Sequence, residues 1–190
     1  MMNSIVQAQI KKINSGFSRP IGYPKTQIKK IGVIGAGLMG HGISLVSLLN
    51  RIEVILLDKT EELATQGQLK INQILKNKID HQEISSNEIE KTLGLIEATD
   101  DFSLLKDCDL IIEAVFEDEK LKSDIIKKLK KNINDNVILS SNTSSIPISI
   151  LAKYSNYPEN FIGIHFFSPV HKMKLVEVIR TKETSLQTIS

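Results

Sequence analysis

Short apolar runs alternate with longer stretches of helical periodicity from residue 28 onward. The runs are rich in β-branched residues and predict strands, which we place at 28–34, 52–57, around 96, at 109–115 and at 137–140. The stretches between them predict helices at 38–50, 61–79, 87–92 and 119–131. Because strands and helices alternate, the pattern predicts an α/β domain whose mostly parallel sheet is covered by helices on both faces.

The end of the chain departs from this alternation. Residues 161–166 and 174–179 are two apolar runs that flank a turn around Pro169, and we predict that they pair as antiparallel strands at the C-terminal end. If the pairing centres on residue 171, His165 lies opposite Glu177. Before these strands, we expect Ser145 to cap a short helix that has Pro147 near its first turn.

Residues 1–27 have the pattern of a linker or leader segment. Four apolar residues fall on one helical stripe, namely Val6, Ile10, Ile13 and Phe17. The regular pattern is then interrupted by Gly16, Pro20, Gly22 and Pro24. Mitochondrial transit peptides are also acid-poor and amphipathic, but they are Arg-rich, whereas this segment has Arg19 alone. We therefore favour a linker helix over residues 1–27, followed by a single domain over residues 28–190.

Composition and charge narrow the class of protein. Of the 190 residues, 41% are hydrophobic and 24% are charged, which is typical of a globular domain. The net charge of +2 argues against a dedicated nucleic-acid-binding protein, and no apolar run approaches the ~20 residues that span a bilayer. A single cysteine, Cys108, excludes an internal disulfide and a cysteine-based zinc site, and we expect no metal site. We expect its thiol to be a buried small hydrophobe in a reducing compartment.

The sequence IGVIGAGLMGHG carries the spacing G-x-G-x-x-G between the first strand and the first helix of the domain. Gly35 permits a tight turn, Gly37 lets the backbone approach a pyrophosphate, and Gly40 lets helix and strand pack closely. Asp58 ends the next strand, where its carboxylate can bind the adenosine ribose and repel a 2′-phosphate. This combination predicts a Rossmann-type, doubly wound fold that binds NAD in preference to NADP. His41, after the last glycine, is expected to be a partly exposed helix residue.

Four motifs extend this prediction: GAGLMG at the glycine loop, EAVFEDEKLK after the fourth strand, SSNTSSIPIS after the fifth, and GIHFFSPVHKMKLVEVI at the final strand pair. Together they resemble the 3-hydroxyacyl-CoA dehydrogenase family, and they look most like the dehydrogenase segment of multifunctional fatty-acid oxidation alpha subunits. The resemblance implies NAD-dependent oxidation of (S)-3-hydroxyacyl-CoA to 3-oxoacyl-CoA in fatty-acid β-oxidation. The β-hydroxyacid dehydrogenases share a similar glycine loop, but they rely on a catalytic lysine and lack an HFFxP strand.

Alcohol oxidation requires a base for the hydroxyl proton while hydride leaves the carbon, and an imidazole titrates near neutral pH. His165 suits this role, and the carboxylate of Glu177 opposite it would fix its tautomer and stabilise the imidazolium. The resemblance implies the same two roles. Ser144 follows the fifth strand, and its hydroxyl can donate a hydrogen bond to the reacting oxygen or to the nicotinamide end of the cofactor. The resemblance assigns Ser144 to that site.

The resemblance implies further cofactor contacts. Glu117 matches a position near the nicotinamide ribose, and Lys122 matches one that reaches the cofactor or the CoA end of the substrate; the alternative for both is a solvated helix start. Asn142 is expected either to shape its loop or to contact the cofactor. Ser168 stands where monofunctional members have Asn, and we interpret it as a mark of the multifunctional branch. Four more contacts are expected from the glycine loop and the fourth strand, namely Leu38, Met39, Val115 and Phe116.

In the family, a helical domain follows that closes the acyl-CoA cleft, forms the dimer and supplies an Asn to the active site. We expect this domain to be absent from the chain and an apolar surface to be exposed where it would pack. The expected partners are an acyl-CoA substrate and a homodimer or larger fatty-acid oxidation complex, with neither nucleic acid nor a membrane span. We expect a cytoplasmic location, with the mitochondrial matrix as the less favoured one. The alternative function is an NAD-binding module without turnover.

Overall fold

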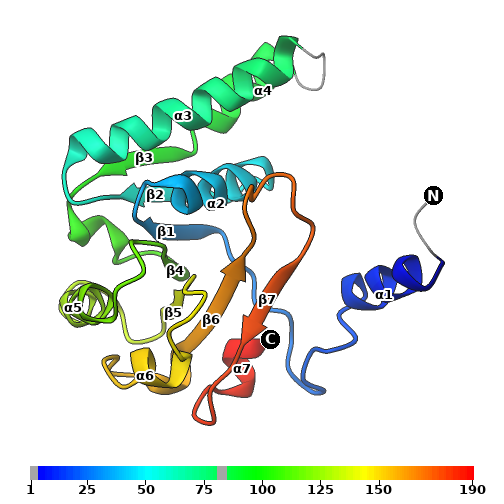
Figure 1. The fold of residues 1–190 in the computed structure, drawn as a ribbon, viewed down its shortest axis with the longest axis vertical. Helices are drawn as coiled ribbons and strands as arrows, with labels where there is room; N and C mark the ends of the chain where they lie inside the picture. The colour runs from blue at the N-terminus through cyan, green and yellow to red at the C-terminus, as the bar shows by residue number, and fades with distance from the viewer. Residues whose placement is uncertain (1–3, 81–84) are drawn as a thin grey trace.

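We describe the protein from a computed structural model that covers residues 4–80 and 85–190. In these residues a seven-stranded sheet runs in the order β3-β2-β1-β4-β5-β6-β7 (Figure 1). The strands are β1 (Lys30–Ile34), β2 (Glu53–Leu57), β3 (Ile96–Thr99), β4 (Leu110–Glu113), β5 (Ile138–Ser141), β6 (Phe161–Phe166) and β7 (Val176–Ile179). All neighbours are parallel except β6 and β7, which are antiparallel. The predicted fold class is confirmed.

Helices cover both faces of the sheet through two separate apolar clusters. The helices after residue 30 are α2 (Leu38–Leu49), α3 (Glu61–Asp80), α4 (Ser86–Leu93), α5 (Glu119–Leu129), α6 (Ile148–Ala152) and α7 (Leu186–Ile189), with 3-10 turns at Phe102–Leu105 and Pro158–Asn160. One cluster joins α2, α3 and α4 to side chains such as Val33 and Leu56, and the other joins α5 and α6 to side chains such as Ile34 and Leu57. Alternate residues of each strand therefore serve opposite faces.

The strand order changes direction at β1. The chain first builds outward from β1 to β2 and β3, and then returns to place β4 on the other side of β1. The loops that leave the carboxyl ends of β1 and β4 therefore diverge to opposite faces, and a crevice opens between them. Ligands of doubly wound folds bind at such a switch point, so the topology alone gives a location for the site.

The N-terminal segment forms a helix, α1 (Ser4–Asn14), which Figure 1 shows apart from the sheet. The predicted apolar stripe extends too far, because the helix ends before Phe17 and a left-handed turn follows at Gly16, whose φ is +70°. The ammonium of Lys12 lies 3.9 Å from the centre of the Phe17 ring. Further along, the Ser190 hydroxyl donates to the Pro24 carbonyl at 2.6 Å, so this part of the segment runs beside the C-terminal end. The division at residue 27 stays a prediction.

Candidate cofactor cleft and active site

A cleft of about 760 Å³ opens at the carboxyl ends of β1, β2 and β4. The glycine loop and the start of α2 form one wall, and α5 forms the other. Seven of the predicted site residues line it, namely Gly35, Gly37, Leu38, Met39, Asp58, Val115 and Phe116. The cleft therefore coincides with the topological switch point, which is where a dinucleotide binds in this type of fold.

The glycines of the loop face different surroundings. Gly35 has a φ of +99°, and a Cβ there would lie 2.8 Å from the Ala114 carbonyl oxygen. A Cβ on Gly40 would collide with the backbone carbonyl of Gly35. A Cβ on Gly37, by contrast, would meet nothing within 4 Å. Two glycines are thus required by the fold itself, whereas Gly37 leaves open space toward the cleft, as a pyrophosphate against the backbone would need.

Asp58 holds the glycine loop against the end of β2. One of its carboxylate oxygens accepts a hydrogen bond from the Ala36 N–H, and the other accepts one from the Lys59 N–H, both at 2.6 Å. These bonds aim the half-buried carboxylate into the cleft that it lines. Each oxygen keeps a second lone pair, so the carboxylate can still accept hydrogen bonds from ribose hydroxyls.

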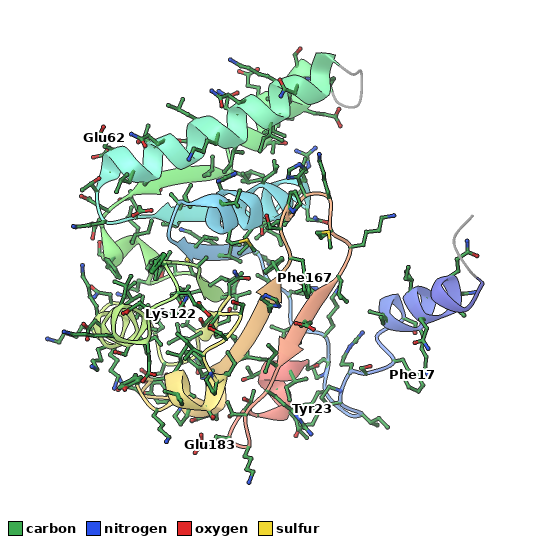
Figure 2. The ribbon with its side chains drawn as sticks, viewed as in Figure 1. Phe17, Tyr23, Glu62, Lys122, Phe167 and Glu183 are labelled. Carbon is green, nitrogen blue, oxygen red and sulfur yellow. The ribbon has the colours of Figure 1, made fainter. Side chains whose placement is uncertain are left out.

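Lys122 does not project outward, as a residue that reaches the CoA end of a substrate would. Its side chain is only 1% exposed, on the side of α5 that faces the sheet (Figure 2). The ammonium donates to a carboxylate oxygen of Glu113 at 2.8 Å and to the Val115 carbonyl at 3.3 Å. It is also 3.3 Å from the second oxygen of Glu117. The buried Glu113 explains the difference, because it provides a counter-charge beneath the helix.

Glu117 accepts several hydrogen bonds from the loop that follows β5. Its Oε1 accepts hydrogen bonds from the backbone N–H groups of Ser144 and Ser145 at 3.0 and 2.9 Å, and from the Thr143 hydroxyl at 2.6 Å. Partial burial raises the pKa of this carboxyl, but the bonds from Thr143 and Ser145 and the charge of Lys122 outweigh burial and lower the pKa to about 2. Glu117 is therefore ionised at neutral pH and fixes the loop that carries Ser144.

Ser145 does not cap the short helix as predicted. α6 begins after Pro147, and no side chain caps it. The Ser145 hydroxyl donates to Glu117 at 2.9 Å instead, and the N–H of Ile146 donates to the Thr143 hydroxyl at 3.0 Å. Because α6 begins at Ile148 and Pro147 occupies its N-cap position, Ser145 lies two residues too early to cap the helix.

Asn142 and Ser144 occupy neighbouring positions with different exposure. The Asn142 side-chain oxygen accepts the Phe166 N–H at 2.8 Å, which ties the end of β5 to the end of β6, as expected for a loop-shaping residue. The exposed Ser144 hydroxyl donates a long hydrogen bond to Glu117 Oε1 at 3.4 Å. Ser168 is also exposed, in the turn between β6 and β7.

The antiparallel pair places His165 directly opposite Glu177, as the predicted register requires. The His165 Nδ1 lies 2.9 Å from a Glu177 carboxylate oxygen. The Phe167 ring, labelled beyond the end of β6 in Figure 2, packs edge-on against the imidazole with centroids 4.6 Å apart. The His165 side chain is 19% exposed, so the ring is oriented on one side and accessible on the other.

His41 and Cys108, two residues outside the His165–Glu177 pair, are both buried. His41 is buried rather than partly exposed, because α2 packs against the sheet at its first turn; its Nδ1 lies 2.6 Å from the Gly37 carbonyl oxygen, and burial lowers its pKa. Cys108 is buried, as predicted, and burial raises the pKa of its thiol to about 11. The thiol therefore stays protonated and is a poor nucleophile.

Sequence reasoning missed Glu113. This carboxylate is 2% exposed, ends β4 and accepts hydrogen bonds from Val115, Lys122 and Ser141. The signal was present, because an acid that ends a run of buried strand residues needs buried donors. Which donors it meets depends on long-range packing, so the sequence pattern alone did not give them.

Residues 30–190 match the sequence model of the 3-hydroxyacyl-CoA dehydrogenase NAD-binding domain, and the chain belongs to this family. It is similar to the fatty acid oxidation complex subunit alpha of Idiomarina loihiensis, with 39% identity over 164 residues, or 86% of this chain and 23% of that protein. It is also similar to the peroxisomal fatty acid beta-oxidation multifunctional protein AIM1 of Arabidopsis thaliana, with 36% identity over 169 residues, or 89% and 23%. The chain thus spans about a quarter of the length of these curated relatives.

Among solved structures, the fold is similar to that of the (S)-3-hydroxybutyryl-CoA dehydrogenase PaaH1 from Ralstonia eutropha. The TM-score is 0.83 at 34% identity, and the match covers 86% of this chain and 58% of that one. NAD is accordingly the cofactor of this domain. The open space at Gly37 and the orientation of Asp58 fit its pyrophosphate and ribose. Within the described residues, no helix has the length and apolar character needed to cross a membrane.

Proposed function

We propose that this chain is the NAD-binding, catalytic part of a dehydrogenase that oxidises (S)-3-hydroxyacyl-CoA to 3-oxoacyl-CoA in fatty-acid β-oxidation. The observation that carries this proposal is the His165–Glu177 pair, which lies at the same edge of the sheet as the carboxyl ends of β4 and β5. When bound, NAD⁺ supplies the acceptor for the hydride that leaves the hydroxyl-bearing carbon of the substrate.

The protein's own residues handle the proton. Because Nδ1 of His165 faces Glu177, its Nε2 is the nitrogen left to take the proton of the substrate hydroxyl. The Glu177 carboxylate stabilises the imidazolium that forms and keeps the ring in one orientation. Ser144 follows β5, and its hydroxyl exchanges the long hydrogen bond to Glu117 for one donated to the substrate oxygen on which carbonyl character develops. Asn142 supports this arrangement, because it ties the Ser144 loop to the strand that carries His165.

The NAD-binding module without turnover is the second candidate, and the exposed strand β7 favours it. Val176, Val178 and Ile179 are 41%, 60% and 38% exposed, so this edge presents apolar surface to solvent. An acyl chain needs an enclosed apolar site, and β7 with its neighbours offers an open one.

The exposed surface of β7 also suggests which partners the chain has. We propose that β7 is covered either by a second copy of the chain or by other parts of a fatty-acid oxidation complex, with an acyl-CoA as the substrate. Sedimentation velocity over a range of concentrations tests the first possibility, with Val178→Lys expected to shift any dimer toward monomer.

We propose the cytoplasm as the location of the protein. One relative is a plant peroxisomal protein by name. A search of the full gene for targeting sequences would distinguish between these two compartments.

The test is the reduction of acetoacetyl-CoA with NADH, followed by loss of NADH absorbance. We expect His165→Ala to lower the rate by about 10²–10⁴-fold with little change in NADH affinity, because only the proton transfer is lost. Glu177→Gln should also lower the rate, whereas the exposed Glu183→Gln is the matched control with unchanged turnover. Turnover that survives His165→Ala would contradict the proposal, and NADH binding without turnover of the wild type would support the module.

A further inference from the structure

Glu113 is a buried carboxylate that lies outside the lining of the cofactor cleft. Its Oε1 accepts hydrogen bonds from the Val115 N–H and the Lys122 ammonium, each at 2.8 Å, and its Oε2 accepts one from the Ser141 hydroxyl at 2.6 Å. Lys122 and Ser141 are themselves 1% and 0% exposed. Because Oε1 accepts two hydrogen bonds and Oε2 accepts one, and the donors Lys122 and Ser141 are buried, the position of Glu113 is fixed.

Two routes, one of hydrogen bonds and one that also includes an ion pair, run from Glu113 to the loop that carries Ser144. Along the first, the Ser141 hydroxyl donates to Glu113 and accepts the Thr143 N–H at 3.3 Å. Along the second, Lys122 joins Glu113 to Glu117, whose Oε1 accepts the N–H groups of Ser144 and Ser145. The two routes start at different oxygens of one carboxylate and end on adjacent residues of one loop.

The same carboxylate also orients the backbone at the floor of the cleft. The N–H of Val115 points to Glu113, and its carbonyl oxygen lies 3.3 Å from the Lys122 ammonium. Both polar groups of this peptide segment are therefore directed into the buried network, while Val115 itself lines the cleft. Glu113 thus acts on the cofactor side and on the Ser144 side of the site at once.

We propose that Glu113 is a positioning residue, which holds the Ser144 loop in place through Ser141 and through the Lys122–Glu117 pair without touching cofactor or substrate. Its effect on turnover rests on the proposed dehydrogenase function, but its effect on the loop does not. The competing explanation is that Glu113 only neutralises the buried charge of Lys122. In that case, removing both charges together would restore the loop.

Amide hydrogen exchange, measured residue by residue by NMR on the full chain, tests the effect on the loop without any need for activity. In Glu113→Gln we expect the amides of Thr143, Ser144 and Ser145 to exchange about tenfold faster or more, because a carboxamide cannot accept on both sides. The glycine-loop amides should be unchanged. Glu97→Gln is the matched control, since Glu97 is an exposed carboxylate on β3 of the same sheet.

Two further variants keep the test decisive if Glu113→Gln folds poorly. Ser141→Ala cuts only the first route, so the Thr143 amide should exchange faster while those of Ser144 and Ser145 stay protected by Glu117. The double variant Glu113→Gln, Lys122→Met removes both buried charges, and we expect the loop to remain loosened. Exchange that returns to the wild-type rate in the double variant, or that never changes in Ser141→Ala, would overturn the proposal.

Kinetics separate this proposal from the proposed function. If the wild type turns over acetoacetyl-CoA, Glu113→Gln should lower kcat by about 10–100-fold, because Ser144 is misplaced. An unchanged kcat in a variant with a loosened loop would overturn the positioning role in catalysis. If the wild type shows no turnover, the proposed function fails, and the exchange rates still decide the role of Glu113 in the loop.

Discussion

Gly37 and Gly40 lie three residues apart in one loop, but the fold requires only one of them. A side chain on Gly40 would collide with the Gly35 carbonyl, whereas a side chain on Gly37 would enter open space beside the cleft. The motif spacing predicted this division, because it gave Gly37 to the pyrophosphate and Gly40 to the close packing of helix and strand. The backbone clash at Gly40 confirms the packing role, and the open space beside Gly37 is what a pyrophosphate would need.

Alanine substitutions at Gly40 and Gly37 should therefore affect different properties, stability in the first case and NAD⁺ affinity in the second. Gly40→Ala should lower the free energy of unfolding by about 1–3 kcal/mol or more, because the clash is with rigid backbone. Gly37→Ala should leave stability within about 0.5 kcal/mol of wild type but weaken NAD⁺ binding by about tenfold or more. Denaturant unfolding and calorimetry measure the two effects. Equal loss of stability in both variants would contradict the assignment.

Glu117 makes the stability of the loop depend on pH. In the unfolded chain its carboxyl takes up a proton near the ordinary pKa of 4.5, whereas the folded chain holds the pKa at about 2. Between these values the unfolded state binds the proton and the folded state does not. The stabilisation is therefore fully present above about pH 4.5 and is lost as the pH falls toward 2.

We expect Glu117→Gln to be less stable than wild type at pH 6, because the charged acceptor of the Ser144 loop is lost. The gap in free energy of unfolding should shrink steadily from pH 4.5 toward pH 2. Urea unfolding at several pH values measures the gap, and Glu183→Gln provides an exposed carboxylate as the control. A gap that stays constant over this range would show that the charge of Glu117 is not what holds the loop.

At the scale of elements, α5 shows where the apolar pattern is ambiguous. The sequence predicted this helix, and helical spacing puts Leu121, Ile125 and Leu129 on one face of it. Leu129 is buried in the core, but Leu121 and Ile125 line the cleft, and Lys122 is the side chain buried beneath the helix. A cofactor cleft has apolar walls as a core does, so periodicity cannot tell the two apart. The ion pair between Lys122 of α5 and Glu113 of β4 depends on how these two elements pack, and the local sequence pattern does not predict it.

The packing of α3 on the glycine loop predicts that a substitution of Gly67 lowers stability and NAD⁺ affinity. Gly67 lies within α3, and helix propensity favours alanine over glycine there by about 1 kcal/mol. A Cβ at this position, however, would lie 2.7 Å from the Ala36 Cβ and 2.9 Å from its carbonyl oxygen. We therefore expect Gly67→Ala to lower both the thermal stability and the affinity for NAD⁺, since Ala36 belongs to the loop. The exposed Gln66→Ala is the control, and a stabilised Gly67→Ala with unchanged NAD⁺ affinity would refute this packing.

At the scale of the whole molecule, the alternation of strands and helices predicted the parallel part of the sheet, and two apolar runs around a turn predicted its antiparallel end. The register that places His165 opposite Glu177 followed from one turn and the strand period of two, which is why it could be predicted. The buried Glu113–Lys122 pair and the burial of His41 could not, because they depend on how distant elements pack. The parts of the site set by local spacing were thus accessible from sequence, and the supporting network was not.

The most direct measurement is a calorimetric titration of NAD⁺ and NADP⁺ into the 190-residue chain and into Asp58→Asn. We expect one NAD⁺ per chain and an affinity for NADP⁺ weaker by about tenfold or more, because the Asp58 carboxylate repels the added phosphate. Asp58→Asn should narrow this difference. Equal affinity of the wild type for both dinucleotides would contradict the role of Asp58. A folded chain that binds no NAD⁺ would contradict the placement of the cofactor between β1 and β4.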